Sequence, residues 1–290
     1  MSSGRPSSGH APLTTPAPPV EQPPVDDQVV IPGYLAELWR GRDDDRPGPK
    51  RAVDLRRIAE VAIDIADRKG LAAVSMRSVA SALGFTSMAL YRYLDSKEQL
   101  IAAMVDVAYG PPPPVPPGGW RDRMTAWARA ELAVMRDHPW VLDSPISEPP
   151  LTPNSLAWME SALGAMDDAP LTDRQKIGCL LTVTVYVHGQ AQLVADVTAR
   201  RAATAEHDSY QRRLAAVIDA EALPRVAAML ASGMLDEDTE DAAADSDPGG
   251  DFEFGLTAIL DGAAAGGATA AGPATVRSHD GAVQRQEDRR

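Results

Sequence analysis

Polar and basic side chains between residues 75 and 97 carry the chemistry that is easiest to interpret in this sequence. Arg77 has a guanidinium, which can bond both major-groove acceptors of guanine. Tyr91, Tyr93 and Lys97 have hydroxyl and ammonium donors of the kind that hold phosphate oxygens. This is the chemistry of nucleic-acid recognition rather than of bond making.

The residues around these side chains predict two short helices joined by a tight turn. Ser75 suits the N-cap of a helix over 76–83, and Gly84 can adopt the left-handed conformation that ends it. Thr86 suits the cap of a second helix that runs through residue 93. Two short helices with a glycine between them are typical of the helix-turn-helix, whose second helix enters the major groove.

The distribution of charge supports a phosphate partner although the whole chain is acidic, with a net charge of -13. Residues 50–104 hold nine cations and six anions, a net charge of +3, which leaves −16 for the rest of the chain. A difference in the sign of the net charge between parts of a chain says more about its binding partners than the total charge does. The basic part is therefore the candidate DNA-binding part.

Apolar residues recur at helical spacing through most of the chain, and no segment shows convincing strand alternation. The fold class is therefore all-α: an N-terminal three/four-helix DNA-binding domain with a helix-turn-helix, then a larger helical ligand-binding and dimerisation domain. The expected helices cover 33–40, 53–69, 75–83, 86–94, 96–109, 120–137, 153–166, 172–201, 209–220, 221–232 and 252–265.

Proline, glycine and serine mark the domain boundaries. The expected parts are a mostly disordered N-terminal extension (1–45), the helix-turn-helix domain (46–109), a Pro/Gly linker (110–119), the helical effector-binding and dimerisation domain (120–265) and a disordered tail (266–290). The basic connector 46–51 is either an arm that reaches the minor groove or a solvated linker.

Residues 53–104 resemble the DNA-binding domain of the TetR/AcrR repressors, most clearly through SMRSVASALGFTSMALYRYLDSKEQL at 75–100. Phe252-Glu253-Phe254-Gly255-Leu256 with Ile259-Leu260-Asp261-Gly262 resembles the final helix of the tetracycline-repressor-type C-terminal domain. The resemblance implies a homodimer in which each ligand-binding domain controls the separation of two DNA-binding heads.

The resemblance also implies DNA-binding roles for nine residues: Arg77, Thr86, Ser87, Met88, Ala89, Tyr91, Arg92, Tyr93 and Lys97. Met88 and Ala89 offer only apolar contact, as with a thymine methyl. Base readout therefore depends on Arg77, Thr86 and Ser87. Tyr91 could instead be a packing aromatic and Arg92 a solvated helix residue, while Phe85 and Leu90 are expected in the core.

An effector pocket needs an apolar cavity with a few placed polar groups. The candidates are Trp127, His138, Trp140, Trp158, Tyr186, His188 and Gln192. Aromatic residues at helical spacing are more often ordinary core than ligand contacts, and His188 with Gln192 could instead form a hydrogen bond across a dimer. The histidines lack ligand spacing and the acidic stretch 236–251 lacks the pattern of a calcium loop, so no metal is expected.

The dimer interface is expected where helix 172–201 pairs with the helix that follows residue 252. Phe252, Phe254, Leu256, Ile259 and Leu260 would be buried against the symmetry mate. A two-fold dimer predicts a pseudo-palindromic operator with half-sites about one DNA turn, or slightly more, apart.

The leading hypothesis is a ligand-responsive repressor that a hydrophobic or amphipathic effector, such as a drug or antibiotic, releases from double-stranded operator DNA. The alternative is an effector-independent activator or architectural protein. No nucleophile–base pair or phosphate loop is evident and Cys179 lies in an apolar segment, so neither an enzyme nor a cofactor is expected. The single cysteine, with no signal peptide and no uninterrupted apolar span, predicts a cytoplasmic protein that does not bind membranes.

Overall fold

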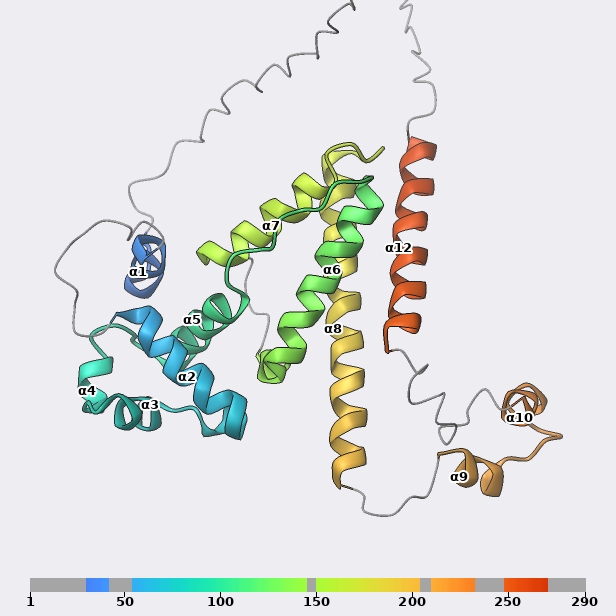
Figure 1. Ribbon diagram of the computed structural model, residues 1–290, viewed down its shortest axis with the longest axis horizontal. Coiled ribbons are helices and arrows are strands. Elements are labelled where there is room, and N and C mark those ends of the chain that lie inside the picture. Colours follow the sequence, from blue (N-terminus) through green and yellow to red (C-terminus); the bar gives the residue numbers. More distant parts are fainter. Residues whose placement is uncertain (1–29, 42–53, 145–149, 204–209, 233–247, 271–290) are drawn as a thin grey trace, which may run out of the picture. The chain divides into compact units, whose positions relative to one another are not determined.

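The computed structural model describes residues 30–41, 54–144, 150–203, 210–232 and 248–270 (Figure 1). Every regular element within these ranges is a helix, which confirms the all-α prediction. Contacts divide the chain between Pro32 and Gly33, so the described helices belong to one unit. The basic connector 46–51, the acidic residues 236–247 and the tail from 271 lie outside the described residues.

The helices that this structure describes are α1 (Gly33–Gly41), α2 (Leu55–Lys69), η1 (Leu71–Ala73), α3 (Met76–Leu83), α4 (Ser87–Leu90), α5 (Lys97–Tyr109), α6 (Trp120–Asp137), η2 (Pro139–Asp143), α7 (Pro153–Ala165), α8 (Asp173–Ala203), α9 (Tyr210–Val217), α10 (Pro224–Ala231) and α12 (Pro248–Ala270). Most agree with the predicted ranges to within a few residues. Three differences matter: α4 is one turn long, η1 and η2 were not predicted, and α12 continues past the predicted end at 265.

Helix α2 organises the N-terminal helices by packing against α1, α3 and α5. Its N-cap Asp54 accepts a hydrogen bond of 2.7 Å from the backbone N–H of Arg57, and Gly70 ends the helix with a φ of 78°. Ile58, Ala59 and Ala62 are completely buried. One apolar core thus holds the helices that surround the helix-turn-helix.

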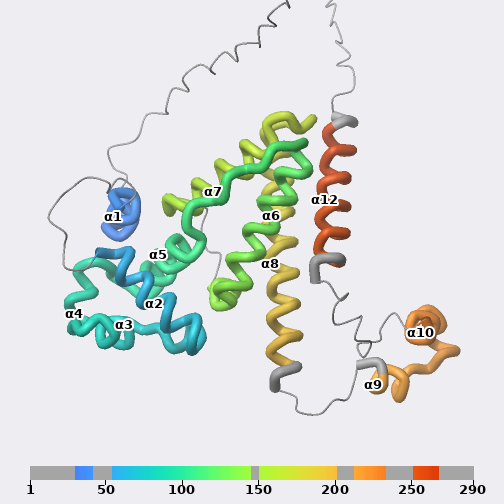
Figure 2. Tube along the Cα trace, in the orientation of Figure 1, coloured from blue at the N-terminus to red at the C-terminus, as the bar shows by residue number. Residues whose placement is uncertain are grey.

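Helices α6, α8 and α12 lie side by side, and α7 packs on α6 and α8 (Figures 1 and 2). Their shared core is rich in large side chains, including Trp127, Trp158 and Phe252. Ion pairs join α6 to α12, from Arg121 to Asp261 and from Arg129 to Glu253. By length and composition alone, residues Asp173–Arg200 of α8 could span a membrane.

Glycine at position 255 lets α12 approach α8 closely. A Cβ there would lie 2.2 Å from the Tyr186 hydroxyl oxygen. That hydroxyl cannot move freely, because the Tyr186 ring stacks on Phe252 with centroids 5.5 Å apart and its oxygen lies 3.0 Å from the Phe252 carbonyl oxygen. Glycine therefore occupies position 255 because any larger side chain would overlap Tyr186.

Gly255→Ala should destabilise the fold by about 1–3 kcal/mol, because it forces the stacked tyrosine out of its position. Gly164→Ala is the matched control, since a Cβ there meets nothing within 4 Å and alanine favours a helix. Thermal unfolding followed by circular dichroism should show a lower midpoint for Gly255→Ala only. Equal midpoints for the two variants would contradict this account of the α8–α12 contact.

Candidate DNA-binding and effector-binding sites

Helix α3 begins and ends with the residues that the sequence indicated. The Ser75 hydroxyl accepts from the backbone N–H of Ser78 at 3.0 Å, and the Ser78 hydroxyl accepts from the backbone N–H of Ser75 at 2.9 Å. Gly84 adopts the left-handed conformation, with φ 75° and ψ 24°. The next residue, Phe85, then donates its N–H to the Ala80 carbonyl at 2.9 Å. These bonds fix the turn of the helix-turn-helix.

The second helix of the motif is shorter than predicted. Thr86 occupies the N-cap position of α4, but its side chain makes no capping hydrogen bond. After Leu90, which is buried, the chain continues as a turn through Tyr93. The expectation that Phe85 lies in the core is wrong: the residue, which follows the left-handed Gly84 in the turn between the two helices, is 42% exposed.

The nine predicted DNA-binding residues lie on α3, on α4 with its flanking residues, and at the start of α5. Five are exposed (Arg77, Thr86, Met88, Tyr91 and Arg92) and four are half-buried (Ser87, Ala89, Tyr93 and Lys97). Ser96 caps α5 by accepting from the Gln99 N–H at 3.3 Å. Hydrogen bonds from its own backbone N–H and from Ser96 lower the pKa of Glu98 in this first turn.

Asp67 of α2 connects the DNA-binding helices to η2. Its Oδ1 accepts from the Trp140 indole N–H at 2.7 Å and lies 2.9 Å from Nδ1 of His138. Trp140 is itself buried in the core of the N-terminal helices. His138 and Trp140 were predicted to bind an effector; in the structure, both side chains contact Asp67 where α2 meets η2.

Asp106 of α5 makes a second joint, at the start of α7. Its carboxylate accepts from the backbone N–H of Asn154 at 2.8 Å and from the Asn154 side-chain amide at 3.1 Å. Burial raises the pKa of Asp106, and hydrogen bonds from Thr152, Asn154 and Ser155 oppose this shift. The joint is reinforced where the Trp158 indole N–H donates to the Gly110 carbonyl at 3.0 Å.

The remaining predicted effector-binding residues do not converge on one cavity. Trp127 and Trp158 are buried in the core of the C-terminal helices, with ring centroids 5.8 Å apart. Tyr186 faces α12, as described above. His188 lies 3.0 Å from the Thr184 carbonyl oxygen of its own helix, and its pKa is lowered by burial, while Gln192 donates to Asp196 at 2.9 Å.

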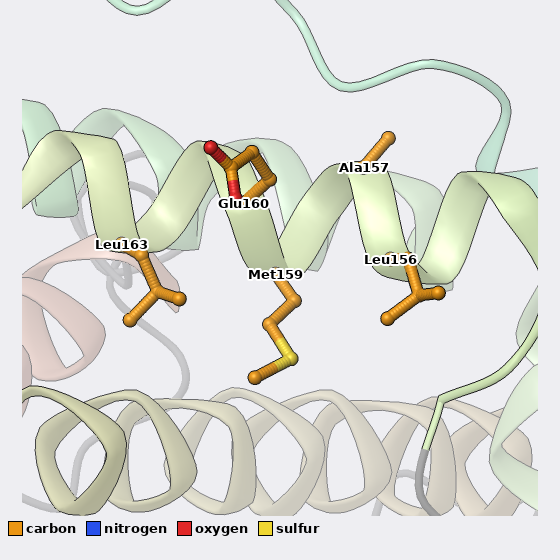
Figure 3. Close-up of a pocket in the computed structure, with 5 residues that line it drawn as sticks. All are labelled: Leu156, Ala157, Met159, Glu160 and Leu163. Carbon is orange, nitrogen blue, oxygen red and sulfur yellow. The ribbon is translucent and has the colours of Figure 1, made fainter. Parts of the chain in front are cut away.

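The structure has a groove beside α7 with a volume of ≈ 380 Å³. Its lining is Leu156, Ala157, Met159, Glu160 and Leu163 (Figure 3). The side chains of Leu156, Met159 and Leu163 point toward the neighbouring helix, while Glu160 points away from it. Cavities that bind small molecules typically have about 300–1,000 Å³, and the volume of this groove lies within that range.

Glu131 of α6 is a candidate functional residue that the sequence interpretation missed. It is 4% exposed, and its Oε2 has no hydrogen-bond partner in the described part of the chain. Burial raises the pKa of its carboxyl to about 8. The signal was present in the sequence, because Glu131 follows Trp127 by four residues and precedes Met135 by four on the apolar stripe of the helix.

The predicted dimer residues divide into inward and outward positions. Phe252, Leu256 and Leu260 are buried in the core that α12 shares with α6 and α8, so they are not free to pack against a symmetry mate, whereas Ile259 is half-buried at the edge of that core. Phe254 is 79% exposed. Helix α8 also exposes large apolar side chains, here called the outer α8 face: Ile177, Leu181, Val185, Leu193 and Val197.

Within the described ranges, the structure contains neither a candidate metal site nor a reactive thiol. No group of three or more His, Cys, Asp or Glu side chains there could hold a metal ion. Cys179 is buried, and burial raises the pKa of its thiol, which disfavours the reactive thiolate.

Comparison with known proteins agrees with these features. Residues 58–104 match the family described as "Bacterial regulatory proteins, tetR family", and residues 112–266 match "Tetracyclin repressor-like, C-terminal domain". The HTH-type transcriptional repressor DrrR1 of Streptomyces coeruleorubidus is 36% identical over 240 residues, which cover 79% of this chain and 83% of the relative.

Two solved structures of ActR from Streptomyces coelicolor have the same fold. Apo ActR has a TM-score of 0.62 at 22% identity, and covers 77% of this chain and 100% of its own. ActR in complex with actinorhodin has a TM-score of 0.61 at the same identity and coverage.

The stability of the protein should depend on the ionisation of Glu131. Because the pKa of the folded state is about 8 and the ordinary value is 4.5, the folded state keeps a proton that the unfolded state loses between these pH values. The free energy of unfolding should therefore fall as the pH rises through this window, by up to roughly 5 kcal/mol. Urea unfolding at several pH values should show this fall for the wild type and not for Glu131→Gln. Parallel pH profiles would contradict the assignment.

Proposed function

Because this chain belongs to the tetR family of bacterial regulatory proteins, we propose that it is a ligand-responsive transcriptional repressor. It binds a pseudo-palindromic operator as a homodimer in the cytoplasm, and a small hydrophobic or amphipathic effector releases it. The observation that carries the proposal is the joint at Asp106, which ties α5, the helix after the helix-turn-helix, to α7, the helix that lines the groove.

One relative supports the repressor part of the proposal, and a ligand-bound structure of the same fold is compatible with the effector part. The relative that is 36% identical is named a transcriptional repressor. The ActR complex with actinorhodin is consistent with a ligand-binding role for this fold, although its 22% identity supports the fold alone. The ≈ 380 Å³ groove of this chain offers room for a small molecule.

The DNA surface uses the exposed residues of the helix-turn-helix. Arg77 and Thr86 read base edges together with Ser87, while Met88 and Ala89 make apolar contacts. Tyr91, Arg92 and Tyr93 hold the backbone with Lys97. Lys97 occupies the first turn of α5, where a cation opposes the helix dipole, and a phosphate beside it would remove that conflict.

The outer α8 face and Phe254 form the dimer interface. Large apolar side chains exposed along one helix mark an interaction surface rather than a solvated one. A second copy of the same face would cover them by two-fold symmetry. Ligand binding between α6, α7 and α8 would then favour a head separation that does not fit adjacent major grooves, with a shift limited by the ligand's differential affinity.

Operator binding tests the proposal directly. We expect the full chain to protect two half-sites in the intergenic DNA beside its own gene in a footprint. Arg77→Ala should weaken binding by about 5–150-fold and relax specificity at one base pair in each half-site, whereas Lys97→Ala should weaken all sequences and reduce the salt dependence. Arg136→Ala, which removes an exposed cation from α6, is the control. Unchanged affinity and specificity in Arg77→Ala would contradict the assigned surface.

The dimer interface can be tested separately. Leu181 and Val185 are 61% and 70% exposed, so a glutamate at either position would leave the fold intact and place a charge in the interface. Sedimentation should show dimers for the wild type and monomers for Leu181→Glu or Val185→Glu. Val217→Glu, at a position 79% exposed on α9, should remain dimeric. A dimer that survives both α8 substitutions would exclude this face.

A further inference from the structure

Helix α1 lies outside both family matches, which cover residues 58–104 and 112–266, yet it packs onto the DNA-binding helices. Tyr34 and Leu38, one helical turn apart, pack in the core that α2, α3 and α5 share. Leu35 is buried as well, at 6% exposure. Because it contacts both α2 and α5, α1 is part of the DNA-binding head (α1 to α5).

The C-terminal part of α1 also reaches the helices that follow the Pro/Gly linker. The Trp39 indole N–H donates to the Leu151 carbonyl at 3.1 Å, although the two residues are 112 positions apart in the sequence. Leu151 lies directly before Thr152, the N-cap of α7. The head thus holds the residues that begin α7 through a helix that belongs to neither matched domain.

The short segment 151–154 is held by two different helices of the head. Helix α1 donates a hydrogen bond to the Leu151 carbonyl, and Asp106 of α5 accepts one from the Asn154 backbone N–H. Each contact from a different helix restricts rotation of the head about the other contacts. Trp39 therefore adds a restraint on the orientation of the head relative to α7.

The two contacts differ in how easily they open. Asp106 is 3% exposed, and breaking its hydrogen bonds would leave a buried carboxylate without donors, which is costly. Trp39 is 39% exposed, so water can replace the Leu151 carbonyl as the acceptor at little cost. The contact through α1 can therefore open while the fold and the Asp106 contact persist.

We propose that α1 is a strap that sets the orientation of the DNA-binding head, and that Trp39 is its positioning residue. This inference rests on the proposed function, because the placement of two heads decides which half-site spacing a dimer fits. With the indole bonded to Leu151, each head is held in one orientation and the dimer selects one spacing. With the bond open, the heads pivot, and neighbouring spacings are accepted with a smaller loss of affinity.

Operators with altered spacing test the strap on the full chain. The DNA probes keep the two half-sites that the footprint defines and gain or lose one or two base pairs between them. Fluorescence anisotropy should show that the wild type binds the natural spacing most tightly. Trp39→Phe, which keeps an aromatic ring and removes the donor, should reduce this preference by about 2–10-fold, the change in an equilibrium that one lost hydrogen bond causes.

Leu151→Ala is the matched control on the other side of the same bond. It keeps the backbone carbonyl that accepts from Trp39, and it shortens a side chain that is 52% exposed. This variant should keep the spacing preference of the wild type.

Hydrogen–deuterium exchange tests the same contact without DNA. In the first turn of α7, the Leu156 N–H donates to the Thr152 carbonyl at 3.0 Å. Peptides that cover residues 151–157 should exchange at least about twofold faster in Trp39→Phe than in the wild type, because the strap no longer holds the start of the helix. Leu151→Ala should exchange like the wild type.

Three results would overturn the strap: a spacing preference that is unchanged in Trp39→Phe, one that is lost equally in Leu151→Ala, or unchanged exchange of residues 151–157 in Trp39→Phe. An equal loss of affinity at every spacing would also overturn it, because α1 would then contact DNA rather than orient the head. Failure of the proposed function is distinguishable. If the wild type bound none of the probes, the repressor would be excluded, and the exchange measurement alone would decide the strap.

Discussion

The hydrogen bonds to the buried carboxylate of Asp106 are the constraint on which the rest of the structure depends. A carboxylate at 3% exposure is stable only with donors, and the first turn of α7 supplies them through Asn154. The last turn of α5 thereby sets where α7 begins. Asp67 does the same between α2 and η2 through Trp140. The helices that present the DNA-binding surface and those that line the groove therefore share polar contacts, which must be kept or exchanged together.

Glu131 shows what the same kind of group does without donors. Asp106 and Glu131 are both acidic and both buried, but the carboxylate of Asp106 accepts hydrogen bonds from the backbone N–H and the side-chain amide of Asn154, whereas Oε2 of Glu131 accepts none within the described residues. One carboxyl group therefore holds α5 to α7, and the other is buried at a cost in stability.

Local signals in the sequence were sufficient for the first helix and the turn of the helix-turn-helix, but not for the length of its second helix. Ser75 and Gly84 act through their immediate neighbours, so their capping roles could be predicted, and the amphipathic pattern gave the bounds of α6. The partners that a side chain contacts depend on tertiary packing, which the amphipathic pattern of the sequence does not specify. Trp140 donates a hydrogen bond to Asp67, and Phe252 faces its own chain while Phe254 faces outward. Glu131 could be placed on a buried stripe from its spacing, but its lack of a partner is visible only in the fold.

The most direct test of this account measures the distance between the two DNA-binding heads. Arg68 is exposed on α2, outside the proposed DNA-binding surface, and Cys179 is buried, so Arg68→Cys gives one accessible labelling site in each protomer. Double electron–electron resonance on the labelled dimer should give a narrow distance distribution, compatible with half-sites about 34–36 Å apart on operator DNA. Adding Asp106→Asn, which replaces an acceptor facing the Asn154 N–H groups, should broaden or shift it. An unchanged distribution would contradict the claim that this joint positions the heads.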